Sequence, residues 1–253
     1  MLLRAENLTR RFGGVSALEA VDVGLRRGAV HAVIGPNGAG KTTLLNVLSG
    51  IYRPHAGRIF LDDVELTARA AHEFAAAGVA RTFQNLQIFF NMSALENVMA
   101  GRWLRSRSSL ACVLFRLPSF RKIEEECRAA AEALMEDVGL ARWLGARADA
   151  MPYGALKRLE IARALAAEPK LLLLDEPAAG LNPSETREID ELIRRIAARG
   201  ITVVLVEHNM KLVMGVAAHV VVLDYGRKLA EGDPRTVSGD ARVIEAYLGA
   251  GGA

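Results

Sequence analysis

The sequence predicts an α/β fold with a mainly parallel β-sheet, an antiparallel β edge and a helical insertion. Apolar runs typical of buried strands recur along the chain as "AVHAVIG", "KLLLLDE", "ITVVLVEH" and "HVVVLDYG". Helical patterns separate most of these runs, and such alternation is typical of a parallel sheet that is covered on both faces. Shorter, partly alternating segments, "LLRAENLTRRF", "ALEAVDVGLRRG" and "GRIFLDD", predict the antiparallel strands.

The middle of the chain has no comparable strand run. Apolar residues there recur at spacings of three and four, as on one face of a helix: Ile123, Cys127, Ala131, Leu134 and Val138. We therefore expect a single domain, with a core of about residues 1–85 and 169–253 and a helical subdomain of about residues 86–168.

Composition and the N-terminal segment indicate the compartment of the protein. Hydrophobic residues make up 51% of the 253 residues, yet no apolar run reaches the roughly 18 residues that span a bilayer. The N-terminal "MLLRAENLTRRF" has interspersed charges and no small-residue cleavage site, so it does not resemble a secretory signal. Cys112 and Cys127 lack metal-ligand spacing and indicate a reducing compartment. We expect a cytoplasmic protein.

The charge balance argues against a nucleic-acid partner. The net charge is only +3, aromatic residues make up 6% of the chain, and the one dense basic stretch, "GRWLRSRSS", is short. Nucleic-acid binders concentrate basic charge in a stripe interleaved with aromatic side chains. The pattern favours a solvated face, with contact to an anionic membrane surface as the alternative.

The most specific motif is "GPNGAGKTT", which spans residues 35–43 between a predicted strand and a predicted helix. Its glycines let backbone N–H groups wrap phosphates, Lys41 reaches the β and γ oxygens, and the Thr42 hydroxyl can bind magnesium. The predicted phosphate-binding residues are Gly35, Pro36, Asn37, Gly38, Ala39, Gly40, Lys41, Thr42 and Thr43.

A carboxylate pair follows the strand run "LLLLDEP". Functional ends of parallel strands lie at their carboxyl edge, where Asp175 can hold magnesium and Glu176 can polarise a water for in-line attack on the γ-phosphorus. A carboxylate pair after a strand is by itself often a loop start. Together with the phosphate loop, it predicts a nucleotide hydrolysis site.

Two further polar residues follow predicted strands. His208 ends "ITVVLVEH", and this position favours contact with the γ-phosphate, whereas the other histidines are interpreted as ordinary surface or core residues. Gln84 closes "VARTFQ" at another predicted strand end, where its amide could touch the metal or the water. The residues alone leave the role of Gln84 open.

The segment "MPYGALKRLE" predicts a second anion site. Gly154 opens an amphipathic helix, and the free N–H groups and the dipole of a helix N-terminus attract an anion. The residues themselves do not identify that anion.

In this order the motifs resemble the ATP-binding cassette (ABC) transporter ATPases over essentially the whole chain. The resemblance implies a P-loop NTPase core that binds ATP and Mg²⁺, with Gln84 and His208 at the reacting phosphate. It places Tyr153 and Gly154 in the family's signature loop. Two cassettes would then face each other, so that the signature of one chain binds the γ-phosphate of ATP held by the other.

The resemblance also gives roles to two weaker positions. Phe12 in "RRFGGVSAL" matches the aromatic residue that stacks on adenine, although a phenylalanine there is often a core residue. Asn182 in "AAGLNPSE" matches the D-loop, where the family prefers aspartate. Asn182 with Pro183 and Glu185 also has the spacing of a helix capping box, and the two interpretations are compatible.

Within the family, the chain is most similar to ATPases of branched-chain amino acid importers. The motifs are "RTFQNLQIFFNMSALENV", "RLEIARALA", "LLLLDEPAAGLNPSET" and "VEHNMKLVMGVAAHVVVLDYGRKLAEGDP". This implies a second ABC ATPase chain, two membrane permease subunits and, indirectly, an extracytoplasmic substrate-binding protein. The chain would be peripheral on the inner face of the cell membrane, and the permease would dock near "NLQIFF".

The signature departs from the family at Pro152, where a serine is usual, and at Ala155, where glutamine is usual. Losing a hydrogen bond to a charged group weakens such a site by roughly 1.5 to 3 kcal/mol. The favoured function is an ATPase that energises an importer, most consistent with branched-chain amino acids. Alternatives are another cargo, such as small amides, urea or exported lipid or lipopolysaccharide, and a low-turnover switch that dimerises on ATP.

Overall fold

The computed structural model describes residues 1–105 and 118–249, so Cys112 lies outside the described residues. By its internal contacts the chain divides into two compact units. The first unit is formed by Met1–Arg81 and Lys170–Ala253, and the second by Thr82–Pro169. The expected subdomain borders near residues 85 and 168 stay a prediction.

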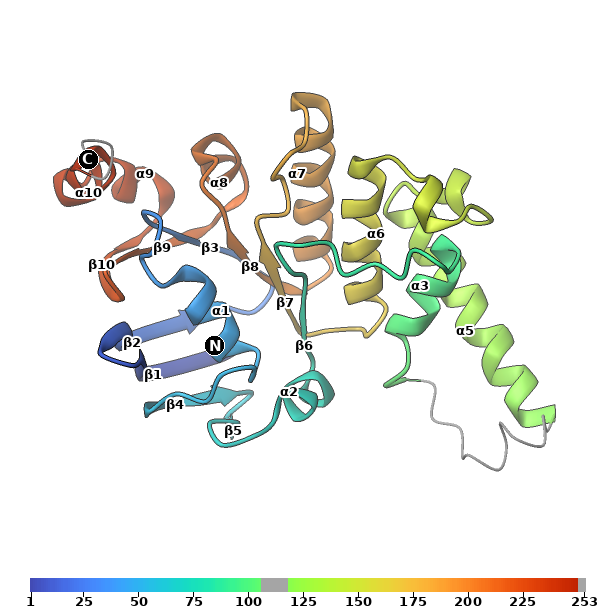
Figure 1. Cartoon of the computed structure of the whole chain (residues 1–253), viewed down its shortest axis with the longest axis horizontal. Coiled ribbons are helices and arrows are strands. Elements are labelled where there is room, and N and C mark those ends of the chain that lie inside the picture. The colour runs from blue at the N-terminus through green and yellow to red at the C-terminus, as the bar shows by residue number, and fades with distance from the viewer. Residues whose placement is uncertain (106–117, 250–253) are drawn as a thin grey trace. The chain divides into compact units, whose positions relative to one another are not determined.

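The first unit contains a six-stranded sheet among the described residues, in the order β10-β9-β3-β8-β7-β6 (Figure 1). Neighbouring strands are parallel except at β10, which pairs antiparallel with β9. The α/β fold class with a mainly parallel sheet is confirmed. The strands are β3 (Val30–Ile34), β6 (Val79–Arg81), β7 (Leu171–Asp175), β8 (Thr202–Val206), β9 (His219–Asp224) and β10 (Arg227–Gly232).

The predicted antiparallel strands are confirmed. The N-terminal segments form a separate four-stranded sheet in the order β2-β1-β4-β5, and the antiparallel edge of the larger sheet is β10. Residues of β1 alternate between buried and exposed at its start, because only one face of this sheet is covered. The strands are β1 (Leu3–Phe12), β2 (Val15–Leu25), β4 (Ala56–Leu61) and β5 (Val64–Glu65).

The two faces of the six-stranded sheet pack against different partners. Successive residues of β3 point to opposite faces, so Val33 joins the core shared with α1 and the antiparallel sheet. Ala32 and Ile34 join the core formed with α8, α9 and α10. The phosphate loop, which follows β3 directly, is therefore supported from both sides of the sheet.

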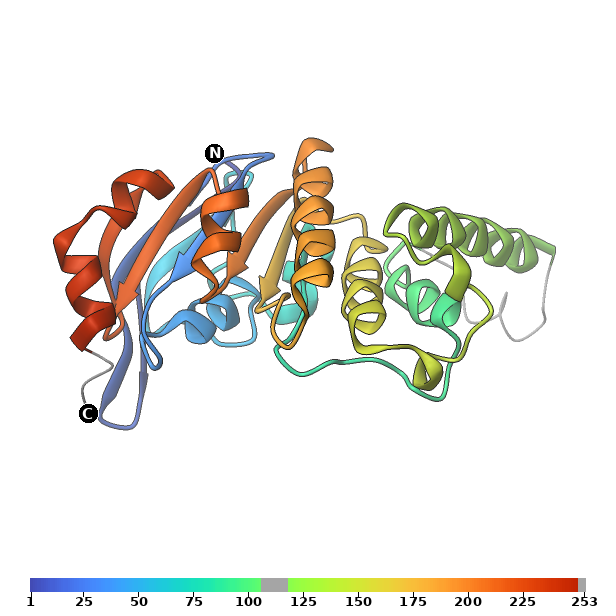
Figure 2. The same ribbon diagram turned by 90° about the horizontal axis from the view of Figure 1, so that it is seen from above.

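The helices of the first unit cover these faces. Helix α1 lies between the two sheets, whereas α7 and α8 lie side by side on the opposite face (Figures 1 and 2). Their bounds are α1 (Lys41–Leu48), α2 (Ala71–Ala77), α7 (Pro183–Ala198), α8 (Met210–Val216), α9 (Pro234–Ser238) and α10 (Ala241–Gly249).

The second unit is helical where it is described. It contains α3 (Ala94–Gly101), α5 (Pro118–Asp137), α6 (Tyr153–Leu165) and two 3₁₀ turns, Ala141–Trp143 and Ala148–Ala150. Helices α3 and α6 approach closely at Gly101, where a Cβ atom would lie 2.1 Å from the Arg163 carbonyl oxygen. Cys127 and Ala131 are buried on the predicted face of α5, and Leu134 is partly buried there. Within the described ranges, no helix is long and apolar enough to cross a membrane.

Candidate functional site

The phosphate loop connects the end of β3 to the start of α1. Gly40 is the N-cap of α1 and has a φ of 98°, and a Cβ atom there would lie 2.4 Å from the Ala17 carbonyl oxygen. Only glycine fits this turn without strain. The N-cap offers no side-chain hydrogen bond to the helix, and the first-turn N–H groups of a helix lack intrahelical partners. The geometry is that of a backbone anion site.

Lys41 is folded back onto its own loop. Its Nζ donates to the carbonyl oxygens of Gly35 and Pro36, at 2.8 Å each. Burial lowers the pKa of Lys41, and the nearby carboxylates of Glu176 and Asp175 act in the opposite direction. The lysine is thus held in the loop with its charged end among oxygen atoms.

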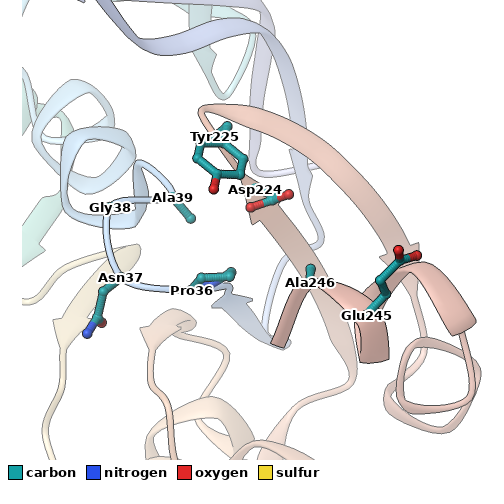
Figure 3. A pocket seen from close by; sticks show the side chains of 8 residues that line it. All are labelled: Pro36, Asn37, Gly38, Ala39, Asp224, Tyr225, Glu245 and Ala246. Atoms are coloured by element: carbon teal, nitrogen blue, oxygen red, sulfur yellow. The ribbon is translucent and has the colours of Figure 1, made fainter. Parts of the chain in front are cut away.

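A pocket of about 280 Å³ is lined by the phosphate loop on one side and by the end of β9 and α10 on the other (Figure 3). Tyr225 and Asp224, from the end of β9 and the turn after it, face the loop across this pocket. The C-terminal helix α10 contributes Glu245 and Ala246 to its lining. The C-terminal segment is therefore a direct neighbour of the phosphate loop.

Asp175 is the last residue of β7 and is buried. Its Oδ2 accepts a hydrogen bond from the Arg81 guanidinium at 3.0 Å, and both side chains are less than 10% exposed. Arg81 also donates to Asn46 Oδ1 at 2.6 Å and to Ser49 Oγ at 3.2 Å. The predicted magnesium ligand is thus part of a buried ion pair, which the sequence analysis did not foresee.

Glu176, the predicted general base, has a φ of 49°, in the left-handed region that L-residues rarely adopt. Its backbone N–H donates to the Val206 carbonyl oxygen at 3.0 Å. Its Oε1 lies 3.7 Å from Nδ1 of His208, whose side chain is 65% exposed. The structure therefore brings Glu176 and His208 together, at a separation slightly beyond a hydrogen bond.

Gln84 belongs to the second unit and is exposed. The prediction that it closes a strand was wrong, because β6 ends at Arg81 and the chain continues as a loop. Further along this loop, Ile88 is buried, whereas Phe89 and Phe90 are about half exposed. The exposed rings give this segment an apolar surface.

The signature segment begins helix α6. Pro152 is the N-cap, has no side-chain hydrogen bond to the helix, and accepts from the N–H groups of Ala155 and Leu156 at 3.0 Å each. Gly154 is buried, and Tyr153 is 45% exposed. Pro152 has no hydroxyl to donate, but the helix N-terminus and its dipole remain.

Two other predicted residues have clear local roles. Phe12 is 41% exposed, contacts the Tyr52 ring edge-on at a centroid distance of 5.3 Å, and lies beneath the Arg10 guanidinium at 4.8 Å. The side chain of Asn182 accepts from the N–H groups of Ser184 and Glu185, which confirms the capping box at the start of α7. Their nucleotide-binding roles stay predictions.

Sequence reasoning missed buried charged residues beside these segments, among them Arg81, Glu207 and Glu160. Arg81 pairs with Asp175. Glu207 accepts the Ala178 N–H at 3.0 Å, and Glu160 of α6 accepts the Phe83 N–H at 3.1 Å. Burial raises the pKa of Glu160. Arg81 and Glu207 stand one to three positions from a predicted site residue, and Glu160 lies inside the signature helix. This proximity along the chain is the only sign in the sequence that these residues matter.

Comparison with known proteins places these features in a family. The ABC transporter family model matches residues 18–179, and a model for branched-chain amino acid ATP-binding cassette transporters matches residues 227–253. The chain belongs to the ABC transporter family of ATP-binding cassettes.

Individual relatives extend over nearly the whole chain. The high-affinity branched-chain amino acid transport ATP-binding protein BraF of Pseudomonas aeruginosa is 42% identical, with 98% of each chain covered. The corresponding protein LivG of Escherichia coli strain K12 is 41% identical at the same coverage. A crystal structure of the ADP conformation of an ATP-binding cassette of an ABC transporter superposes with a TM-score of 0.85. It is 33% identical, with 98% of each chain covered.

The residues present fit a nucleotide with a magnesium ion. Among the described residues, no group of three or more His, Cys, Asp or Glu side chains could hold a metal ion. Magnesium usually takes only one or two protein ligands and completes its shell with water and substrate phosphates. Thr42 is an exposed residue in the first turn of α1, and its hydroxyl would suit such a shared shell.

Proposed function

We propose that this chain binds ATP with Mg²⁺ and hydrolyses it to energise an ABC importer of branched-chain amino acids. The observation that carries the proposal is the meeting of three features in the first unit. These are a phosphate loop at a helix N-terminus, a carboxylate pair at the end of β7, and His208 at 3.7 Å from Glu176. The names of BraF and LivG support the cargo.

The proposed reaction uses these residues in distinct roles. Backbone N–H groups of the loop and α1 bind the phosphates, and Lys41 leaves the carbonyls of Gly35 and Pro36 to reach the β and γ oxygens. Glu176 accepts a proton from the attacking water as the water oxygen bonds to the γ-phosphorus. The bond from that phosphorus to the β–γ bridging oxygen breaks, and ADP and inorganic phosphate leave. His208 contacts the γ-phosphate, and Phe12 stacks on adenine.

Thr42, Asp175 and Gln84 are the proposed magnesium ligands. When bound, the ion would neutralise charge on the β and γ phosphate oxygens. Asp175 would bind the ion while remaining paired with Arg81. It would therefore combine a metal-binding role with a structural one.

The proposed assembly has a second ABC ATPase chain, either a sister subunit or another copy. Tyr153, Gly154 and the N-terminus of α6 would bind the γ-phosphate of the partner's ATP, and Asn182 would lie in the D-loop. Two permease subunits would hold the chain on the inner face of the membrane, with the exposed Phe89 and Phe90 as the docking surface. A substrate-binding protein would deliver cargo from outside. The membership of the ABC transporter family supports this arrangement.

Phosphate release by the purified chain tests the proposal. With Mg-ATP, the rate per chain should rise with protein concentration, because hydrolysis needs two cassettes. If ATP binds but phosphate release stays at background, adding the sister ATPase and permeases should restore it. No release in the complete assembly would refute the ATPase assignment. Release that leucine, isoleucine and valine with their binding protein fail to stimulate would refute the cargo.

A further inference from the structure

Glu207 is a buried carboxylate to which the proposed reaction gives no role. It follows β8 directly and is only 1% exposed. Its Oε1 accepts the Ala178 N–H at 3.0 Å. Its Oε2 accepts the N–H groups of His208 at 3.2 Å and of Asn209 at 3.3 Å. One side chain thus joins two loops that come from different strands.

These two loops carry the reacting side chains. Ala178 lies two residues after Glu176, and His208 follows Glu207 itself. The N–H of Glu176 donates to Val206, the residue before Glu207. The backbone on both sides of Glu176 is therefore fixed by two consecutive residues at the end of β8. A left-handed φ such as the 49° of Glu176 persists only where the surroundings hold it.

A carboxylate is suited to this double attachment in a way that other side chains are not. Both of its oxygens accept hydrogen bonds, so one can serve each loop. A glutamine amide has one acceptor oxygen, and its NH₂ group would face a backbone N–H donor at the other position. An apolar side chain would serve neither loop and would leave these N–H groups without their acceptor.

We propose that Glu207 is a positioning residue that sets the relation between Glu176 and His208. It acts through the backbone N–H groups of Ala178 and His208, without contact to nucleotide. This inference rests on the proposed function, because it assigns Glu207 to the geometry of the hydrolysis step.

The first experiment does not depend on hydrolysis. Amide hydrogen exchange is measured on the nucleotide-free full chain for peptides covering residues 176–182 and 207–212. Glu207→Gln should speed exchange in at least one of these peptides. Glu73→Gln is the matched control, because the Glu73 carboxylate also accepts a backbone N–H, that of Ala70 at 2.8 Å, at the start of α2. Unchanged exchange in both peptides of Glu207→Gln would overturn the inference.

The second experiment separates positioning from folding. In Glu207→Gln, kcat for ATP should fall by about tenfold or more, because small displacements of reacting groups are costly. The Kd for ADP should change by less than about twofold, because the phosphate loop is untouched. Glu207→Asp keeps two acceptor oxygens on a shorter arm and should recover part of kcat; it replaces the glutamine variant if that variant fails to fold.

In this second experiment, two results would overturn the inference while leaving the proposed function intact. One is a kcat for Glu207→Gln that equals that of an active wild type. The other is a parallel loss of kcat and ADP affinity in both Glu207 variants, which indicates a purely structural role. A wild type that never releases phosphate refutes the proposed function instead, and the exchange experiment still decides whether Glu207 joins the two loops.

Discussion

The two units differ in whether their predicted sites are formed by side chains or by backbone groups. In the first unit, the side chains of Asp175, Glu176 and His208 stand at strand ends and contact one another or a buried arginine. In the second unit, the predicted signature offers only the backbone at the N-cap of α6, because Pro152 makes no side-chain hydrogen bond there. A site made of side chains fails when one is changed, whereas a site made of backbone N–H groups tolerates substitution. In the proposed assembly, this difference would allow a signature with proline and alanine to bind the partner's γ-phosphate through backbone N–H groups.

The largest effect is expected at Glu176. Glu176→Gln removes the proposed proton acceptor, so ATP turnover should fall by roughly 10²- to 10⁴-fold, the usual contribution of a general base. ADP affinity should stay unchanged because the phosphate loop is intact. Phosphate release and ADP titration measure the two quantities. Turnover above about a tenth of the wild-type rate would contradict a side-chain-based site in the first unit.

A pH effect on stability should appear in the first unit. Burial lowers the pKa of His31 to about 4, with Arg26, His219 and Glu231 as charged or titratable neighbours. Between about pH 6.5 and pH 4, the unfolded state therefore binds more protons than the folded state. The stabilisation is fully present above pH 6.5 and is lost as the pH is lowered toward 4. The loss by pH 4 should be about 3 kcal/mol.

His31→Gln tests that assignment by denaturant unfolding across this pH range. The His31 Nε2 accepts the Arg26 N–H at 2.8 Å, and a glutamine oxygen can replace this acceptor without titrating. The variant should lose less stability on acidification than the wild type. Equal pH slopes in the two proteins would show that other groups dominate acid unfolding.

A smaller effect is expected at the signature. Pro152→Ser introduces a hydroxyl at the N-cap of α6 that, in the proposed assembly, would donate to the partner's γ-phosphate. A hydrogen bond to a charged group is worth roughly 1.5 to 3 kcal/mol, so turnover should rise by about tenfold to 150-fold. The gain should appear only at protein concentrations where two chains associate. An unchanged rate at saturating ATP would mean that backbone groups alone supply the second unit's contribution.

The smallest effect concerns the Asn182 cap. Asn182→Ala removes the acceptor for the N–H groups of Ser184 and Glu185, so the unfolding free energy should fall by about 1 kcal/mol. Comparing this loss with the change in turnover separates the cap from the proposed D-loop role. A loss of turnover far beyond the loss of stability would favour direct involvement at the nucleotide.

The sequence predicted those parts of the fold that depend on local pattern. Uniformly apolar runs such as β7 are buried on both faces and so reveal the parallel sheet. The partly alternating N-terminal segments revealed the antiparallel strands, but alternation does not show that these strands form a sheet of their own. The residues joined by long-range hydrogen bonds were missed for a similar reason. Nothing local to Arg81 or Glu207 indicates that a strand brought alongside will place Asp175 or Ala178 within reach.

The pairing of Arg81 with Asp175 has a consequence for how the chain behaves without magnesium. A lone aspartate buried at a metal position would make folding depend on the ion, as in small metal-stabilised domains. Here the guanidinium, held by Asn46 and Ser49 as well, is a permanent counter-ion built into the strand beside it. If Asp175 holds magnesium as proposed, chelation should stop ATP turnover while leaving the melting temperature of the nucleotide-free chain unchanged, because the fold at this strand end does not depend on the metal.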